Sequence, residues 1–352
     1  MNAAVLARLE ALPRERFGLL PTPLVRGPAL GRAIGLTELW IKHDELMGFG
    51  FGGNKLRGLE LLLADAKAQR ADVLITGAGA QSNHVRATAA CAAYGGMESI
   101  AVYWGSEPLA VQGNLRLARL LGAQTRFTNT ADRAHVDVAI GEVAADLRAH
   151  GRRPYTIPRG GACALGVLGH VLAVRELALQ CTSLGIRPGR VVLAVGSGTT
   201  LAGWLLGTAL FAAPWRVEGV TVSRPAAEVR SRVAALAFEG AALLDLPSPI
   251  SDADIVVHGG FIGDGYGLPS ACGDAAVTLA ARVQGLFLDP TYTGKAFAAL
   301  IAHTAEGRYG ESGPVVFIHT GGEPALFADA PRAGASPTPD TCAPATSKGS
   351  HL

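Results

Sequence analysis

One repeating unit constrains the fold most: a short β-branched apolar run, a glycine or polar turn, and then a segment with helical spacing. This order is typical of α/β folds, in which helices cover mostly parallel strands. The first series of units predicts strands at 39–42, 73–76, 100–104 and 125–127 and helices at 55–69, 82–94, 111–121 and 136–149. We expect these elements to form one compact unit.

A second series of the same units follows the turn Gly160-Gly161. It predicts strands at 191–195, 217–222, 255–258 and 315–319 and helices at 165–180, 201–211, 225–239, 270–284 and 294–305. These elements predict a second, larger domain. Residues 333–352 are rich in Pro, Ala, Ser and Thr and nearly lack large apolar side chains, which predicts a disordered tail.

The stretch 191–215 is charged only at its flanks and is long enough to cross a bilayer. The sequence Gly196-Ser197-Gly198-Thr199-Thr200 interrupts it near its start. We therefore predict a buried strand, a glycine turn and a buried helix here, and no membrane span.

The charge balance points to a small-molecule partner. The chain has 31 Lys and Arg residues against 29 Asp and Glu, a formal charge of +2, which is too small a field to recruit nucleic acid or an anionic membrane. Its five cysteines include no C-x-x-C pair, so we expect thiols in a reducing cytoplasm. Charged residues interrupt the first 16 positions, and no export signal is expected.

Lysine is scarce, with five lysines beside 26 arginines. Lys55 follows Gly52-Gly53-Asn54 and opens a predicted helix. A positive charge at a helix N-terminus is unfavourable against the macrodipole, by a few tenths to about 1 kcal/mol. Lys55 is therefore either a solvated residue of the first turn or a lysine that forms a Schiff base with a cofactor.

Two further motifs lie at predicted helix starts. The polar side chains of Gln81-Ser82-Asn83-His84 either cap the helix or, with free backbone N–H groups, bind a carboxylate. The glycines and hydroxyls of 196–200 suit a phosphate, although a tight turn between buried elements is the alternative. This second motif matches neither the Walker loop nor the dinucleotide-binding fingerprint.

A lysine nucleophile, an anion-binding helix start and a separate phosphate loop are what a pyridoxal phosphate enzyme acting on an amino acid requires. From Pro21 to Phe327 the chain resembles, motif after motif, the D-cysteine desulfhydrase and 1-aminocyclopropane-1-carboxylate (ACC) deaminase family. The motifs that carry this resemblance are Pro21 to Leu24, Trp40 to Asp44, Gly52 to Arg57, Gln81 to His84, Gly196 to Gly203, Leu288 to Lys295 and His319 to Gly322.

The resemblance implies an α/β protein of fold type II, with two open, twisted, mostly parallel sheets flanked by helices. It implies a large cofactor-binding domain made of 1–55 and 159–332 and a small domain of 56–158. It also implies pyridoxal 5′-phosphate joined to Lys55 through an imine, a small amino-acid substrate and a homodimer.

The resemblance also implies roles for single residues. The catalytic residues would be Lys55, Ser82, Tyr266 and Tyr292, the two tyrosines being suited to proton transfer, although each could instead be a core residue with a satisfied hydroxyl. The substrate would be bound by Ser82, Asn83, His84 and Tyr266, the first three holding its carboxylate. The cofactor would be bound by Lys55, Asn54, Asn83, Gly196, Ser197, Gly198, Thr199, Thr200, Thr293 and Thr320. No metal is expected.

Two positions separate the branches of the family. The deaminase branch typically has Glu where Thr293 stands and Leu where Thr320 stands. A carboxylate near the pyridine nitrogen keeps that nitrogen protonated and strengthens the electron sink, which opening a cyclopropane needs more than losing a thiolate does. This favours conversion of D-cysteine to pyruvate, sulfide and ammonia. ACC deamination to 2-oxobutanoate and ammonia is the alternative.

Some positions depart from the family pattern, namely His43, Phe49, Phe51, Gly58 and Cys163. They leave room for a reshaped pocket that serves another D-amino acid, cysteate, or a specialised biosynthetic β-elimination or β-substitution. A further interpretation is a protein that senses an amino acid without turnover. The intact set of Lys55, Ser82, Tyr266 and Tyr292 argues against it.

Overall fold

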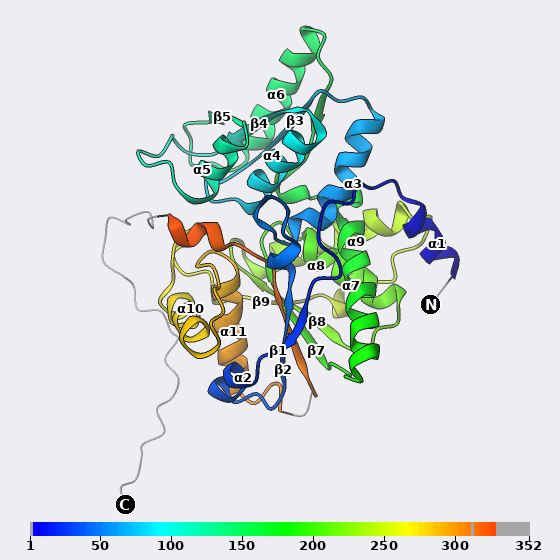
Figure 1. The fold of residues 1–352 in the computed structure, drawn as a ribbon, viewed down its shortest axis with the longest axis vertical. Helices are drawn as coiled ribbons and strands as arrows, with labels where there is room; N and C mark the ends of the chain where they lie inside the picture. The colour runs from blue at the N-terminus through cyan, green and yellow to red at the C-terminus, as the bar shows by residue number, and fades with distance from the viewer. Residues whose placement is uncertain (1–2, 311–312, 329–352) are drawn as a thin grey trace, which may run out of the picture.

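The structure is a computed structural model that describes residues 3–310 and 313–328. It consists of a smaller upper part and a larger lower part, each built around its own sheet (Figure 1). The predicted disordered tail at 333–352 lies outside the described residues.

The larger sheet has six strands in the order β1-β2-β10-β7-β8-β9, and only the β1–β2 pair is antiparallel. Its strands are β1 (Leu24–Arg26), β2 (Leu39–His43), β7 (Arg190–Val195), β8 (Arg216–Thr221), β9 (Val256–His258) and β10 (Val315–His319). Val191, Leu193 and Val195 of β7 pack in one core, while Val192 and Ala194 pack in the other. The two-residue period of a strand thus buries both faces of the sheet.

Helices cover both faces of this sheet (Figure 1). One layer contains α1 (Ala3–Ala11), α7 (Ala164–Leu184), α8 (Thr199–Leu210) and α9 (Ala226–Ala242), and the other contains α2 (Pro28–Ile34), α10 (Ala271–Gln284) and α11 (Thr293–Ala305). Among the described residues, α7 is the one helix long and apolar enough to cross a membrane, but over half of its apolar window is buried inside the protein. The apolar character of α7 is therefore explained by its position as the central helix of the core.

The smaller sheet is fully parallel, with the order β5-β4-β3-β6. Its strands are β3 (Val73–Ala78), β4 (Glu98–Tyr103), β5 (Gln124–Phe127) and β6 (Pro154–Thr156), and its helices are α3 (Lys55–Ala68), α4 (Asn83–Gly95), α5 (Gly113–Leu120) and α6 (His135–Ala149). Val73 and Ile75 pack on α6, whereas Leu74 packs on α3 and α4. All of these strands lie within 56–158, and the domain boundaries themselves stay a prediction.

The two parts meet where α3 crosses α7. At Gly58 a Cβ atom would lie 2.9 Å from the carbonyl oxygen of Gly166, so only glycine allows the two helices to approach this closely. Gly58, which departs from the family pattern, is therefore explained by helix packing.

The predicted elements are present, with ends shifted by up to four residues. Residues 191–215 form β7, a turn and α8, as expected. The sequence patterns missed α1, α2, β1 and β6. The last three are too short for periodicity, since α2 has seven residues and β1 and β6 have three each.

The expectation that all cysteines are free thiols is confirmed for only some of the described cysteines. Cys91 and Cys181 are free and buried, and Cys163 is free and half-buried. Cys272 is disulfide-bonded, so the expectation is wrong for this residue.

A buried ion network lies behind the loop that carries Lys55. Arg57 donates from Nε to Asp44 Oδ2 at 2.9 Å and from Nη2 to Asp44 Oδ1 at 2.6 Å. The same guanidinium donates to both oxygens of Glu176, at 3.0 and 3.1 Å, and Lys42 forms a further ion pair with Glu176. These contacts join β2, α3 and α7 into one unit.

Candidate active site

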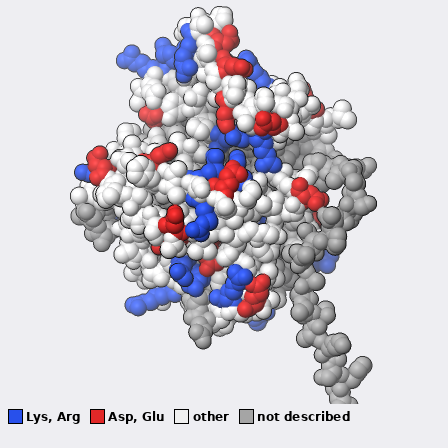
Figure 2. Space-filling model, turned by 180° about the vertical axis from the view of Figure 1, so that it is seen from behind, with Lys and Arg blue, Asp and Glu red and all other residues white. Residues whose placement is uncertain are grey.

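A pocket lies where the carboxyl ends of parallel strands from both sheets face each other. Ala78 ends β3, Trp104 follows β4, Gly196 follows β7 and Thr320 follows β10, and all four line the pocket. Crevices at the carboxyl ends of such strands are where α/β proteins bind ligands. Figure 2 shows Lys and Arg side chains gathered where this face of the molecule is hollowed between its upper and lower parts.

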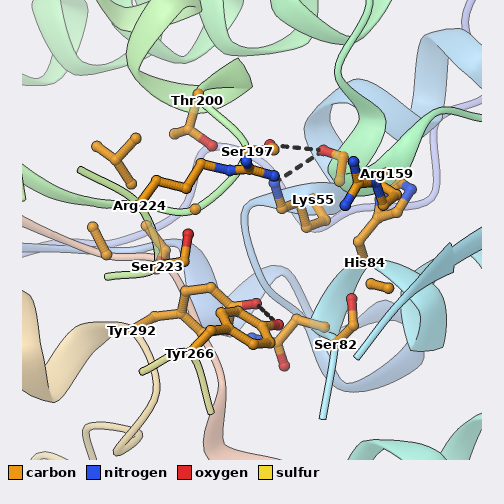
Figure 3. A pocket seen from close by; sticks show the side chains of 18 of the residues that line it. Lys55, Ser82, His84, Arg159, Ser197, Thr200, Ser223, Arg224, Tyr266 and Tyr292 are labelled. Carbon is orange, nitrogen blue, oxygen red and sulfur yellow. Dashed lines mark hydrogen bonds between the residues drawn. The ribbon is translucent and has the colours of Figure 1, made fainter. Parts of the chain in front are cut away.

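Lys55 is the first residue of α3 and projects into the pocket (Figure 3). Its amine donates to the carbonyl oxygen of Gly160 at 3.1 Å. Burial lowers the pKa of Lys55 to about 8, and no charged partner among the described residues opposes this effect. A neutral amine is a nucleophile, so this lysine is suited to attack an aldehyde at ordinary pH.

We expect the rate at which cofactor-free protein captures pyridoxal phosphate to rise with pH through about 8. Only the neutral amine attacks the aldehyde. Because the pKa of Lys55 is lowered, most of its amine is already neutral above this pH. An ordinary lysine would show the same rise near 10.4. Stopped-flow absorbance across pH 6.5 to 10 measures this profile, and a midpoint near that of an ordinary lysine would contradict the assignment.

The turn between β7 and α8 provides room for an anion. At Gly196 a Cβ atom would lie 3.2 Å from Cε1 of Tyr292, and Gly198 has a φ of +96°, so both positions favour glycine. Ser197 Oγ lies 3.0 Å from Thr199 Oγ1 at the N-terminus of α8. Free backbone N–H groups at a helix N-terminus attract negative charge.

Asn54 connects this turn to Lys55. Its Nδ2 donates to Thr200 Oγ1 at 3.0 Å, while its own N–H donates to the carbonyl oxygen of Thr320 at 3.0 Å. Hydroxyls, glycine backbone and a helix N-terminus therefore converge next to a half-buried lysine, and no Asp or Glu among the described residues lines the pocket. This donor set fits a phosphate ester that carries an aldehyde.

The N-terminus of α4 forms the opposite wall. Ser82 is its N-cap, and Ser82 Oγ accepts from the backbone N–H of Val85 at 3.3 Å. Asn83 Oδ1 accepts from Asn114 Nδ2 at 2.8 Å, which fixes the orientation of its amide. Burial, with the nearby charge of Lys55, lowers the pKa of His84 to about 3, so the imidazole is neutral.

We expect Ser82→Ala to lower kcat/KM roughly 10-fold to 150-fold, since one hydrogen bond to a charged group contributes about 1.5 to 3 kcal/mol. The visible absorbance of the bound cofactor should stay. Ser270 caps α10 in the same way, with its Oγ accepting from the N–H of Gly273 at 3.2 Å, but it does not line the pocket. If Ser270→Ala and Ser82→Ala had equal kinetic effects, the role of Ser82 would be capping alone.

Tyr266 and Tyr292 lie on the side of the larger part, with their hydroxyls hydrogen-bonded to each other (Figure 3). Burial raises the pKa of Tyr266 to about 12 and raises that of Tyr292 well above its ordinary value. Both phenols therefore hold their protons at neutral pH. They are suited to donate a proton or to hold one in place, rather than to abstract it.

Comparison with known proteins agrees with this geometry. Residues 16–321 match the family described as "Pyridoxal-phosphate dependent enzyme". The chain belongs to this family. It is therefore a pyridoxal phosphate enzyme with the fold that the sequence predicted, and the expected cofactor is confirmed.

Named relatives cover nearly all of the chain. It is 41% identical to the D-cysteine desulfhydrase of Klebsiella pneumoniae (strain 342) over 332 residues, which are 92% of this chain and 98% of the relative. The D-cysteine desulfhydrase of Salmonella typhimurium is 40% identical over 328 residues, with the same coverage.

Two solved structures are similar to this chain over most of its length. An ACC deaminase homologue superposes with a TM-score of 0.85 at 36% identity, covering 93% of this chain and 97% of the other. A threonine deaminase from T.th. superposes with a TM-score of 0.63 at 19% identity, covering 91% and 97%, which shows the fold alone.

The pocket of this pyridoxal phosphate enzyme brings together most of the residues selected from the sequence. These are Asn54, Lys55, Ser82, Asn83, His84, Gly196, Ser197, Gly198, Thr200, Tyr266, Tyr292 and Thr320. Thr199 lines a small cavity beneath Lys55 instead. Thr293 does not line the pocket, because its hydroxyl donates to Asp289 Oδ1 at 2.7 Å.

Sequence reasoning missed Trp104 and four arginines that line the pocket, namely Arg133, Arg159, Arg224 and Arg232. Trp104 and Arg224 come just after β4 and β8, so their position after parallel strands was a usable signal. The loop that carries Arg133 has no motif, and no signal in the sequence singled it out.

The aromatic departures from the family pattern do not reshape the pocket. Phe49 packs against Phe17, with ring centroids 4.5 Å apart, and against Tyr94. Phe51 is 52% exposed, and neither phenylalanine lines the pocket. The expectation that these side chains alter the substrate site is therefore wrong for the described structure.

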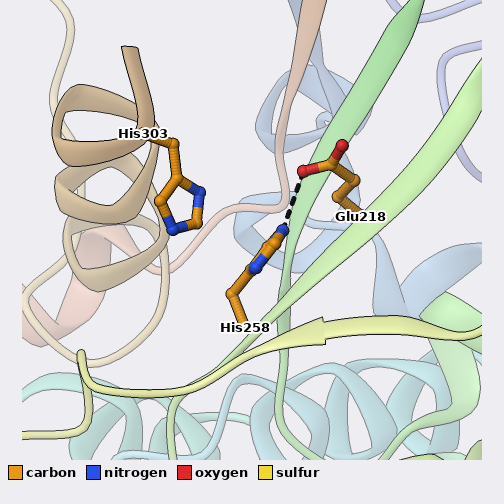
Figure 4. Close-up of side chains that lie close together, drawn as sticks. All are labelled: Glu218, His258 and His303. Carbon is orange, nitrogen blue, oxygen red and sulfur yellow. Dashed lines mark hydrogen bonds and ion pairs between the residues drawn. The ribbon is translucent and has the colours of Figure 1, made fainter. Parts of the chain in front are cut away.

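A second ionisable cluster lies outside the pocket, where Glu218, His258 and His303 bring together side chains from β8, β9 and α11 (Figure 4). Their ligand atoms lie within 4.8 Å of one another, a spacing that could hold a metal ion. Glu218 already pairs with Arg190 Nε at 3.0 Å and with His258 Nε2 at 2.8 Å. These contacts explain the cluster as a network that stabilises the edge of the sheet.

Proposed function

We propose that the enzyme eliminates the β-substituent of a small amino acid and deaminates the product. D-cysteine, which would give pyruvate, sulfide and ammonia, is the first candidate. The observation that carries this proposal is the half-buried Lys55, whose amine faces a pocket with the glycine- and hydroxyl-rich turn before α8 on one side and the N-terminus of α4 on the other. The similarity to D-cysteine desulfhydrases over 92% of the chain supports it.

Lys55 would hold the cofactor, and its Nζ, when free, would take the Cα proton of the substrate. Its pKa near 8 leaves part of this amine neutral at pH 7 to 8, as a proton acceptor requires. Bound pyridoxal phosphate supplies the electron sink for the pair that the Cα–H bond leaves behind. Tyr292, which keeps its proton, would donate to the departing group or orient it.

The start of α4 would hold the substrate carboxylate. Ser82 Oγ and the free N–H groups of the first turn provide donors there. Asn83, whose amide is fixed by Asn114, would contact the hydroxyl side of the cofactor ring. His84 is held by Thr76, with 3.1 Å between Nε2 and Oγ1.

The second candidate is ACC deamination, which the similarity to the solved ACC deaminase homologue favours. Thr320 lines the pocket where that branch of the family has Leu. The proposed cofactor contact of Thr293 would require its hydroxyl to leave Asp289, or the threonine to act through that buried carboxylate. Both features support D-cysteine as the better substrate.

The purified holoenzyme should release sulfide and pyruvate from D-cysteine at rates far above its release of 2-oxobutanoate from ACC. L-cysteine in parallel tests the stereochemistry. If ACC were the better substrate, the second candidate would replace the first. If cofactor bound but no amino acid were turned over, the protein would be a sensor.

We further propose that the enzyme is a cytoplasmic homodimer. The resemblance to the family supports a dimer and a cytoplasmic location. Among the described cysteines, the free thiols of Cys91, Cys163 and Cys181 support a reducing compartment, whereas the disulfide-bonded Cys272 opposes it. Light scattering after size exclusion measures the mass, and a mass near 36 kDa would contradict the dimer.

A further inference from the structure

The pocket carries more positive charge than its named parts require. Lys55 and four arginines line it, and no Asp or Glu of the described residues does. Two of the arginines are neutralised by carboxylates that lie outside it, since Arg159 donates to both oxygens of Asp137, at 2.8 and 2.6 Å. Arg224 pairs through Nη1 with one oxygen of Glu228, Oε1.

The other two arginines, Arg133 and Arg232, form no ion pair with any carboxylate of the described residues. Arg232 lies beside the phosphate loop, where a Cβ atom on Gly198 would be 3.9 Å from Arg232 Cβ. The Nε atom of Arg232 is buried and without a hydrogen-bond partner, as a group that awaits the cofactor phosphate would be.

Arg133 lies elsewhere, beside the tyrosine pair. Its guanidinium carbon is 5.2 Å from the ring centroid of Trp104 and 5.3 Å from that of Tyr266. Its Nη1 donates to the carbonyl oxygen of Ser223 at 3.3 Å, so a residue from the loop before α6 reaches across to the large sheet. The two rings hold the guanidinium in place while part of its hydrogen-bonding capacity remains unused.

The pocket thus offers three separate places for negative charge. The cofactor phosphate has the N-terminus of α8, and the substrate carboxylate has the N-terminus of α4. Arg133 provides the third, next to the hydroxyls that would face the departing group. D-cysteine has no second permanent anion to place there, because its thiol is mostly neutral at pH 7.

We propose that this third place binds a second anion on the substrate, and that Arg133 selects three-carbon amino acids whose β-substituent is a tetrahedral oxyanion. Cysteate and O-phosphoserine represent this class. The inference rests on the proposed β-elimination and names its substrate class. Arg133 recognises such a group with a planar, permanently charged fork of N–H donors.

The reaction balances without any oxidant or reductant. The Cα–H and Cβ–S bonds of cysteate break, and the electron pair of the Cβ–S bond leaves with sulfite. The 2-aminoacrylate that remains takes up one water and gives pyruvate and ammonium. With O-phosphoserine the Cβ–O bond breaks and phosphate leaves instead.

The test compares kcat/KM for cysteate and O-phosphoserine, as both enantiomers, with kcat/KM for D-cysteine. Wild type should turn over at least one of the anionic substrates in addition to D-cysteine. In Arg133→Met, which keeps an apolar stem between the two rings, the ratio of cysteate to D-cysteine should fall roughly 10-fold to 150-fold. Arg133→Lys, which keeps a positive charge, should lower this ratio less than Arg133→Met does. Arg148→Met, an exposed arginine on α6, is the matched control and should leave the ratio unchanged.

Binding provides a readout apart from turnover. Homocysteate carries its sulfonate on the γ-carbon, from which β-elimination cannot expel it, so calorimetry on the holoenzyme measures its affinity. That affinity should fall by the same factor in Arg133→Met and stay in Arg148→Met.

Three results would overturn the inference. First, wild type could turn over D-cysteine but neither anionic substrate. Second, Arg133→Met could lower kcat/KM equally for D-cysteine and for the anionic substrates, which is the result expected if Arg133 only holds the two parts of the protein together. Homocysteate affinity could also be unaffected in Arg133→Met. If no amino acid of either class gave pyruvate, the proposed β-elimination itself would fail, which is a different outcome.

Discussion

The Lys55→Ala variant is expected to lose at least about 10⁴-fold in kcat for D-cysteine, because one side chain holds the cofactor and accepts the Cα proton. Wild type treated with borohydride should carry the reduced cofactor on Lys55, and the variant should carry none. Sulfide and pyruvate release measure the first effect, and mass spectrometry of peptides measures the second.

The remaining described lysines are poor substitutes. Lys42 is engaged by Glu176, and Lys295 donates to the carbonyl oxygens of Ile262 and Gly265 at 2.6 and 3.0 Å. Lys67→Ala is the control, since Lys67 is 37% exposed and pairs with Glu15 at 2.9 Å. A reduced adduct found on Lys42 or Lys295 would refute the assignment of Lys55.

Local sequence predicted the parts of the site that depend on short motifs. Lys55, Ser82 and Gly196 each open or precede a helix after a glycine-containing turn, so their position at the carboxyl ends of strands follows from the α/β order. The resemblance added Tyr266 and Tyr292, which the structure brings into contact although 26 positions separate them.

Contacts between distant segments could not be predicted in this way. Arg133 reaches the pocket only because the loop before α6 packs over Ser223, and no local pattern specifies that packing. Thr293 shows the opposite case. It lies in a family motif, but the nearest acceptor, Asp289, turns its hydroxyl away from the pocket. A motif places the backbone, whereas side-chain direction depends on tertiary partners.

The Asp44→Ala variant is expected to lower the free energy of unfolding by about 3 to 5 kcal/mol, the usual cost of removing one partner from a buried ion pair. Asp44 is fully buried and accepts two hydrogen bonds from Arg57 and one from Thr22. Without it, the buried guanidinium of Arg57 keeps only Glu176 as a charged partner among the described residues. Urea denaturation of both proteins at pH 7 measures the difference.

The pKa of Asp44 predicts how the stability difference between wild type and Asp44→Ala changes with pH. Burial alone would raise the pKa of Asp44, but the charge and hydrogen bonds of Arg57 outweigh it and hold the pKa below its ordinary value. A carboxyl whose folded-state pKa is lowered stabilises the protein above its unfolded pKa, roughly 3.9, and this contribution disappears as pH falls through the folded-state pKa. Wild type should therefore lose stability below about pH 4 more steeply than Asp44→Ala does.

The matched control is an exposed pair of the same kind. Asp245 pairs with Arg8 at 3.4 Å, with the two side chains 83% and 49% exposed, so Asp245→Ala should change the unfolding free energy by less than about 1 kcal/mol. Because Asp44 also accepts the N–H of Gly53 through its backbone carbonyl at 3.0 Å, the network supports the turn that leads into Lys55. Equal stability losses in the two variants would mean that burial adds nothing to the Asp44–Arg57 pair. The rigidity of the lysine-bearing turn would then have to come from its glycines and from Asn54 alone.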